Sequence, residues 1–160
     1  MTIIFNDKIE QEPVAELIQK LDVANKEDGP HVLYLSSTGG SCSTASLLIS
    51  YLNTKCSEWK LIGYEHLYSS AFDVFLDFKG VKEILLETSL VLHLASSPIE
   101  TRETTKMSKN IQRTLKDIDY SNERLLKKLK RIGISNDMIN SIKKGKDVWL
   151  YDKDIEKLKF

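Results

Sequence analysis

The chain of 160 residues has no excess of one charge, no long apolar run and no cysteine framework. Lysine and arginine together number 23, as do aspartate and glutamate, so the formal net charge at pH 7 is zero. A balanced chain has no net field that would favour nucleic acid or a membrane surface. No apolar run approaches the length of about 20 residues that a membrane span requires. We therefore expect neither nucleic acid nor a membrane as a partner, and a single globular domain with a substantial core.

Cysteine is scarce, with only Cys42 and Cys56 present. Two cysteines form neither a disulfide framework nor a zinc pattern, so we expect no metal site and no cofactor. Reduced thiols are typical of cytoplasmic proteins. The N-terminal residues Met1–Phe5 enter an apolar strand directly, without the basic region and cleavage site of a signal peptide. These features predict a cytoplasmic protein.

The most informative segment is Leu33–Ser41, an apolar strand that runs into two adjacent glycines and then a helix. Glycines at such a turn let backbone N–H groups approach a ligand closely, because no Cβ atom is in the way. The following helix directs its N-terminal N–H groups and the positive end of its dipole into the same space. A turn of this kind can hold a phosphate, a carboxylate or the oxyanion that forms in acyl transfer.

Strand and helix patterns alternate along the first half of the chain. Apolar strands are predicted at 3–5, 32–35, 61–64, 84–86 and 90–92, and helices at 12–21, 41–52 and 71–78. Strands separated by helices in this order favour an α/β fold with a mostly parallel sheet covered by helices. In the helix at 71–78, the spacing predicts that Phe72, Phe75 and Leu76 face inward and that Asp73 and Asp77 face outward, with Gly80 ending the helix.

The second half contains a long, polar helical pattern from Glu103 to Arg131. Its apolar stripe consists of Met107, Ile111, Leu115, Ile118, Leu125 and Leu129, with a polar gap at Asn122. Such a helix would be about 45 Å long, which exceeds the width of a small domain. It therefore projects and packs against a partner chain, or lies across its own sheet, or breaks near Tyr120. The basic run Lys127–Arg131 suits the C-terminal end of a helix better than a nucleic-acid site.

Several residues could carry catalysis. Ser69 and Ser70 lie where a strand ends and a helix begins, which suits a nucleophilic serine, although serine also caps helices without any catalytic role. His93 follows an apolar strand, where sites assemble in open α/β sheets.

Two other histidines compete with His93 for the role of base. His31 opens a strand, at the opposite end from this site, and His66 is three residues before Ser69. Asp147, in a charged turn before an apolar segment, is a candidate acid. Cys42, beside the glycine turn, is a less favoured nucleophile than a simple helix residue.

These parts together match the requirements of acyl transfer. The segments that carry a resemblance to a known family are Ile3–Ile4–Phe5, Ser36–Ser37–Thr38–Gly39–Gly40–Ser41, Tyr68–Ser69–Ser70–Ala71, Thr88–Ser89, Leu92–His93 and Lys146–Asp147–Val148–Trp149–Leu150. They resemble the Clp protease proteolytic subunit, within the crotonase-like fold. The glycine segment is similar to that family's Asn-Ser-Pro-Gly-Gly-Ser turn, with threonine in place of proline. The resemblance runs from Ile3 to about Lys157.

The resemblance implies one ClpP-like domain over residues 1–160, with a handle-like helical region at about 95–132. It implies a serine peptidase that cleaves peptides or unfolded protein inside a homo-oligomer. Ser69 is the implied nucleophile, with Ser70 as the alternative, His93 the base and Asp147 the acid that orients it. The amides of Gly40 and Ser70 are the implied oxyanion hole.

The sequence also departs from the family pattern. The family's axial loops precede its first strand, which here is expected at residue 3, and this puts docking to an ATP-dependent unfoldase in doubt. Residues 94–101 contain no glycine, although the family has a glycine-rich strand there. Two other hypotheses therefore remain: an inactive ClpP-like protein that assembles with or regulates other subunits, and a crotonase-like acyl-CoA enzyme.

Overall fold

The computed structural model describes residues 1–95 and 109–160. The described strands are β1 (Thr2–Asn6), β2 (Val32–Ser37), β3 (Lys60–Tyr68), β4 (Val81–Ile84), β5 (Ser89–Leu92) and β6 (Val148–Leu150). The described helices are α1 (Gln11–Ala24), α2 (Cys42–Lys55), α3 (Ser70–Asp77), α4 (Lys109–Arg131), α5 (Asn136–Lys143) and α6 (Asp152–Ile155). Most of the glycine-free segment at 94–101, and the first residues of the predicted long helix, including Met107, lie outside the described residues.

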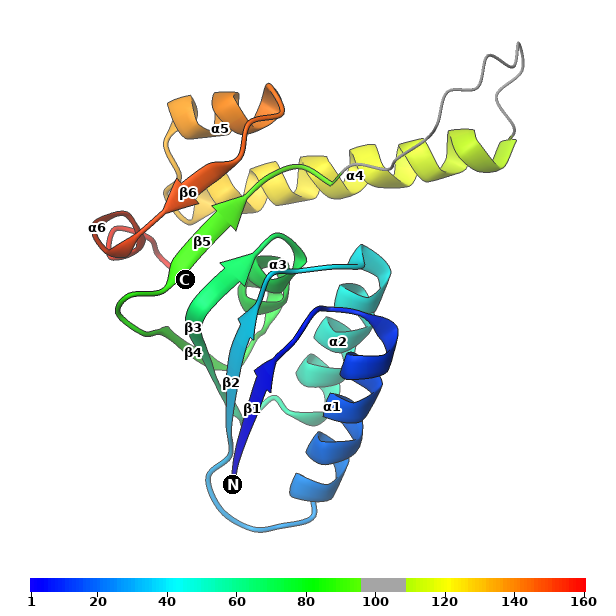
Figure 1. Cartoon of the computed structure of the whole chain (residues 1–160), viewed down its shortest axis with the longest axis vertical. Helices are drawn as coiled ribbons and strands as arrows, with labels where there is room; N and C mark the ends of the chain where they lie inside the picture. Colours follow the sequence, from blue (N-terminus) through cyan, green and yellow to red (C-terminus); the bar gives the residue numbers. More distant parts are fainter. Residues whose placement is uncertain (96–108) are drawn as a thin grey trace.

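The strands form one sheet in the order β1-β2-β3-β5-β6, with β4 also paired to β3 (Figure 1). The first half of β3 pairs with β4 and its last residues pair with β5, all in parallel. Between these two halves, Glu65 has a left-handed φ of 50°, which redirects the strand from one neighbour to the other. Among the described strands, only β6 runs antiparallel to its partner, β5. The α/β class and the mostly parallel sheet predicted from the sequence are confirmed.

The core lies between one face of the sheet and helices α1, α2 and α3. Strand β1 shows why: Ile3 and Phe5 are buried whereas Ile4, which points to the other face, is 65% exposed. The helices contribute apolar stripes at helical spacing, including Leu17 and Leu21 of α1 and a matching stripe on α2. Burying one such leucine contributes about 1.5–3 kcal/mol to stability.

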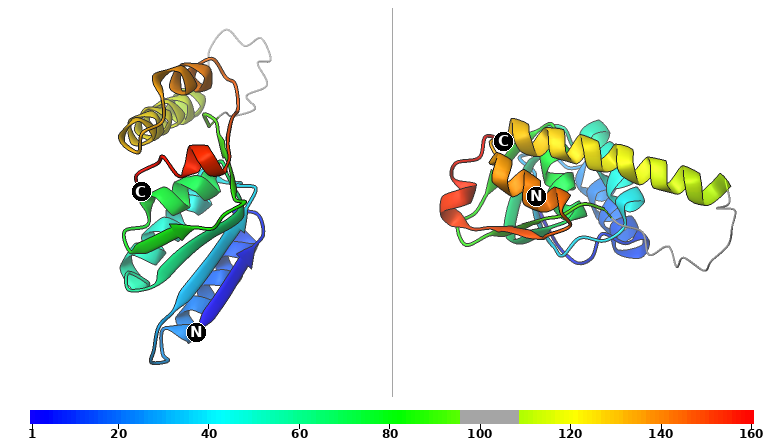
Figure 2. Two further views of the ribbon diagram at one scale, coloured as in Figure 1. Left: turned by 90° about the vertical axis from the view of Figure 1, so that its left-hand side faces the viewer. Right: turned by 90° about the horizontal axis from the view of Figure 1, so that it is seen from above.

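Helix α4 crosses one end of the molecule and extends beyond the sheet (Figures 1 and 2). Its C-terminal part belongs to the core, because Leu129 is buried and Leu125 and Leu126 pack against it. One end of this helix therefore lies on its own domain and the other projects. The alternative of a break near Tyr120 is wrong, because α4 is continuous from Lys109 to Arg131. Within the described residues, no helix has the length and apolarity needed to cross a membrane.

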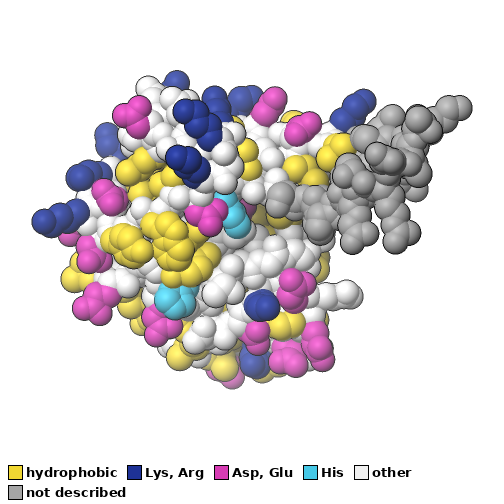
Figure 3. Space-filling view, turned by 45° about the horizontal axis from the view of Figure 1, so that its top comes forward, with side chains coloured by type: hydrophobic (Ala, Val, Ile, Leu, Met, Phe, Trp, Pro, Cys, Tyr) yellow, Lys and Arg dark blue, Asp and Glu magenta, His cyan; other side chains and the backbone are white. Residues whose placement is uncertain are grey.

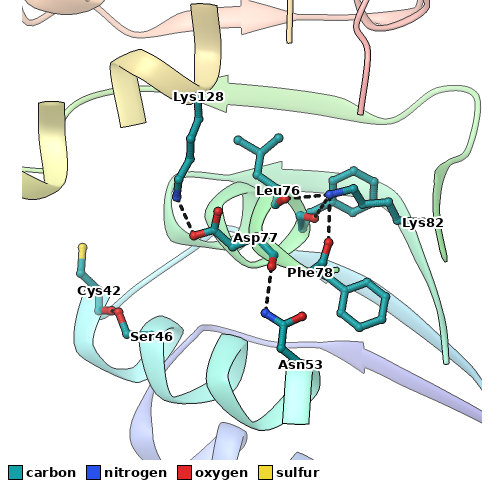
Figure 4. Close-up of polar contacts among 9 residues, drawn as sticks. Cys42, Ser46, Asn53, Leu76, Asp77, Phe78, Lys82 and Lys128 are labelled. Atoms are coloured by element: carbon teal, nitrogen blue, oxygen red, sulfur yellow. Dashed lines mark hydrogen bonds and ion pairs between the residues drawn. The ribbon is translucent and has the colours of Figure 1, made fainter. Parts of the chain in front are cut away.

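The prediction that Gly80 ends α3 is wrong. The helix ends at Asp77, and its last carbonyls are bound by the ammonium group of Lys82, which donates to Phe75, Leu76 and Phe78 oxygens at 3.2, 2.7 and 3.0 Å (Figure 4). Glycine is needed at position 80 for another reason. A Cβ atom there would lie 2.5 Å from the Phe78 ring and 2.6 Å from the Ser57 oxygen.

Candidate active site

The glycine turn is held against the start of α3. Gly39 has a φ of 89°, and a Cβ atom on it would lie 2.7 Å from the Tyr68 oxygen and 2.8 Å from the Ser69 Cβ. On its other side, the Ile9 amide donates to the Gly39 oxygen, and the Ser41 amide donates to the Ile9 oxygen, each at 2.9 Å. Only glycine fits at position 39, and the close packing places the turn directly beside Ser69.

Ser69 lies on a sharp turn between β3 and α3. Its φ of 54° and ψ of −127° are unusual for a residue with a side chain, and such strain costs about 1–3 kcal/mol. The turn is anchored by the Ser69 amide, which donates to the Val91 oxygen at 3.0 Å. A strained strand-to-helix turn of this type exposes the side chain at the end of a sheet, as in the nucleophile elbow of α/β-hydrolases.

The two neighbouring serines have different surroundings. Ser70 is only 2% exposed, and its hydroxyl donates to the Gly40 oxygen at 3.2 Å. Ser69, in contrast, lines an open cavity of about 110 Å³. Accessibility to a substrate therefore favours Ser69 over Ser70.

Two backbone amides beside Ser69 are free to bind an anion. Ser70 is the first residue of α3, so its N–H has no acceptor within the helix. The Gly40 N–H donates to no acceptor in the part of the chain that the structure describes. With the dipole of α3 behind them, these donors suit a developing negative charge.

His93 and Asp147 are brought together by strand pairing. Strands β5 and β6 are antiparallel, with Leu92 opposite Val148, so the next positions along the ladder are His93 and Asp147. The His93 Nδ1 lies 3.4 Å from the Asp147 Oδ1. Both side chains face solvent, at 40% and 55% exposed, so this pair contributes little to stability.

His93 and Ser69 line the same cavity, and no hydrogen bond joins them. The chain after His93 is held by Asn122 of α4, whose amide group exchanges two hydrogen bonds with the Ala95 backbone at 2.8 and 3.1 Å. The polar gap in the apolar stripe of α4 thus has a role: Asn122 fastens the segment that follows His93.

Asp73 differs from its predicted position. The sequence pattern placed it outward, but the structure places it on the wall of the cavity, with most of its surface covered. Burial raises the pKa of the Asp73 carboxyl to about 6, with Lys128 acting in the opposite direction and Asp77 raising it further. Asp73 lies four residues after Ser69, so the two residues are on the same side at the start of α3. This spacing could have identified Asp73 from the sequence as a residue close to Ser69.

The remaining candidates have other roles. Cys42 lines the cavity, but burial and then the nearby Asp73 raise its thiol pKa, which disfavours the nucleophilic thiolate. His31 stacks on Trp59 at 4.8 Å, and His66 does not line the cavity; its Nδ1 lies 3.0 Å from the Tyr68 hydroxyl. Among the described residues, no three His, Cys, Asp or Glu side chains are grouped so as to hold a metal ion.

No protein-family model and no curated protein sequence matches the chain. A solved structure does: a mutant of ClpP1 from Listeria monocytogenes is similar over 97% of this chain and 85% of that one. The TM-score is 0.72 and the sequence identity is 17%. The ClpP-like fold that the sequence motifs indicated is therefore confirmed, and at this identity the likeness concerns the fold.

Proposed function

We propose that this chain is a serine peptidase that cleaves peptides or unfolded segments of protein. The observation that carries the proposal is a single cavity that holds Ser69 on a strained turn together with His93, itself 3.4 Å from Asp147. A nucleophile, a base and an orienting acid in this order are the requirements of a catalytic triad.

In the proposed mechanism, the Ser69 hydroxyl attacks the scissile carbonyl and His93 accepts its proton. The imidazolium then donates that proton to the leaving amine, and Asp147 orients the ring and stabilises its charge. Water, deprotonated by His93, next attacks the ester carbonyl on Ser69, which releases the acid product and returns the proton to the Ser69 oxygen. The N–H groups of Gly40 and Ser70 bind the oxyanion. Loss of one such donor costs about 3–4 kcal/mol of transition-state stabilisation.

The missing hydrogen bond between Ser69 and His93 is compatible with this mechanism. Catalytic hydrogen bonds are often long without substrate and tighten when the substrate binds. In the proposed enzyme, the projecting part of α4 packs against a second copy of the chain, and assembly excludes water from the exposed His93–Asp147 pair. A homo-oligomer is therefore part of the proposal.

A fluorophosphonate probe tests the proposal directly. We expect one covalent adduct per chain, on Ser69, detected by mass spectrometry of the intact protein and its peptides. The adduct should be lost in Ser69→Ala and form at least 100-fold more slowly in His93→Ala. The exposed Ser50 of α2 provides a control, because Ser50→Ala should label at the wild-type rate.

Other outcomes identify the alternatives. A folded, oligomeric protein that forms no adduct would indicate an inactive assembly or regulatory subunit. An adduct that persists in Ser69→Ala and disappears in Ser70→Ala would make Ser70 the nucleophile. Turnover of acyl-CoA thioesters that survives Ser69→Ala would indicate the crotonase-like reaction.

A further inference from the structure

The wall of the cavity beside Ser69 carries an acidic group that the proposed mechanism does not use. Asp73 lies one helical turn after Ser69. The backbone N–H of Asp73 donates to the backbone carbonyl oxygen of Ser69 at 3.4 Å. Both residues line the cavity together with His93. A substrate residue bound with its carbonyl at Ser69 would therefore have its side chain within reach of the Asp73 carboxylate.

The cation with the largest effect on Asp73 is already engaged by another acid. Lys128 of α4 forms an ion pair with Asp77 at 2.5 Å, and both groups are mostly buried (Figure 4). Arg124, one helical turn before Lys128 on α4, also lines the cavity, but it is exposed to solvent. In the described part of the chain, the Asp73 carboxylate forms no hydrogen bond and no ion pair.

A covered carboxylate without a direct partner is unfavourable, because it loses water and regains only part of that stabilisation from the charges of Lys128, Arg124 and His93, none of which forms an ion pair with it. The elevated pKa of Asp73, about 6, reflects that burial, and the group is still mainly ionised at pH 7.5. A ligand that supplies a cation would form a charge-assisted hydrogen bond and remove the penalty. An apolar ligand would cover the carboxylate further, and an acidic one would be repelled by it.

We propose that Asp73 makes this cavity select a lysine or arginine side chain in the residue whose carbonyl faces Ser69. Asp73 then determines specificity rather than taking part in bond breaking. This inference rests on the proposed function for the position of the substrate, but the selective binding of a cation does not require hydrolysis.

Binding to Ser69→Ala protein tests the inference without turnover. Short peptide amides that end in lysine, norleucine or glutamate, otherwise identical, would be titrated calorimetrically at pH 7.5. We expect the lysine peptide to bind at least tenfold more tightly than the norleucine peptide, and the glutamate peptide to bind least. In the double variant with Asp73→Asn, the lysine preference should fall to twofold or less. Asp137→Asn, an exposed acid on α5, is the matched control and should keep the full preference.

The result separates this inference from the peptidase proposal. If Ser69 reacts with a fluorophosphonate but lysine and norleucine peptides bind equally, the inference is wrong and the peptidase proposal stands. If Ser69 is inert but the lysine preference is present and depends on Asp73, the inference stands and the cavity binds cationic peptides without cleaving them. Equal lysine preference in the Asp73→Asn and parent proteins would also overturn it. Thermal unfolding of each variant confirms that it is folded.

Discussion

At the scale of single residues, the ionisation of Asp73 on the wall of the cavity affects the stability of the whole protein. Folding raises the pKa of its carboxyl from 3.8 to about 6, chiefly through burial. Below pH 4 the carboxyl is largely protonated in both the folded and unfolded states, so the difference in pKa has little effect on the free energy of unfolding. As pH rises from 4 to 6, the unfolded chain releases its proton first, and the native state loses stability. Above pH 6 the full penalty is present, about 3 kcal/mol.

Asp73→Asn should remove this penalty. We expect the variant to be more stable than the wild type by up to about 3 kcal/mol at pH 8, with the difference shrinking as pH falls from 6 to 4. Urea unfolding of both proteins at pH 4, 6 and 8 measures it, and titrating groups that do not interact with Asp73 cancel in the comparison. A difference that stays constant across this range would show that Asp73 is not held in an unfavourable ionised state.

Gly39 is the second residue whose substitution is diagnostic. A Cβ atom at this position would collide with Tyr68 and Ser69, so Gly39→Ala must displace the turn that carries Ser69, the proposed nucleophile. We expect at least a 100-fold loss of fluorophosphonate labelling, since small displacements of reacting groups have effects of this size.

Gly29→Ala is the control for the glycine substitution. Gly29 also has a positive φ, 118°, but nothing lies within 4 Å of its Cβ position. The control should lose some stability through backbone strain and keep its labelling rate. Equal rates in the two variants would mean that the glycine turn does not position Ser69.

At the scale of secondary-structure elements, α3 is held at both ends. Its start carries Ser69 against the glycine turn, and its last carbonyls bind the half-buried ammonium group of Lys82. The same group lies 5.6 Å from the centre of the Phe75 ring. One cation thus replaces the glycine cap that the sequence suggested, because it satisfies several orphan carbonyls at once.

Lys82→Met should therefore destabilise the protein. We expect a loss of about 2–3 kcal/mol, because three carbonyl groups lose a charged donor in a partly buried position. Lys79→Met, at an exposed position near the same helix end, should change stability by less than about 0.5 kcal/mol. Urea unfolding monitored by circular dichroism measures both variants. Equal stabilities would show that solvent satisfies the end of α3.

At the scale of the whole molecule, the projecting helix is the feature most suited to assembly. Leu115 and Ile118 lie on the part of α4 nearer the projecting end, where they are half-buried in the single chain.

The face shown in Figure 3 also carries exposed apolar side chains beside histidines and acids. Trp149 and Tyr151, stacked at 6.3 Å, are both about half exposed.

If α4 mediates assembly, Leu115→Glu combined with Ile118→Glu should lower the mass measured by light scattering to that of a smaller species. The reason is that two charges would be buried without partners in the contact between copies. Lys116→Glu, at an exposed position of the same helix, should leave the mass unchanged. An unchanged mass in the double variant, with its helix content intact, would exclude this surface as the contact.

Local patterns in the sequence were sufficient for the order of strands and helices in the first half of the chain, the mostly parallel sheet and the glycine turn before α2, but α5, β6 and α6 were not predicted. These features depend on residues close together in the chain: apolar periodicity, paired glycines and a serine that caps a helix, as Ser41 does for α2. The limits of elements were less accurate: the strand predicted at 84–86 is in fact β4, at Val81–Ile84. Strand β3 extends to Tyr68 because it changes partner at Glu65, which no local pattern reveals.

The candidate site, too, has some features that the local sequence predicts and others that it does not. The sequence by itself determined which residues could serve as nucleophile, base and acid, since each lies at a strand end or turn. Only the tertiary structure decided that β6 runs antiparallel beside β5, which places Asp147 opposite His93 from 54 positions away. It also decided that α4 lies over the end of α3, so that Asp73 lines a cavity instead of facing water. The burial of a charge depends on what packs over it, and that covering element is remote in the chain.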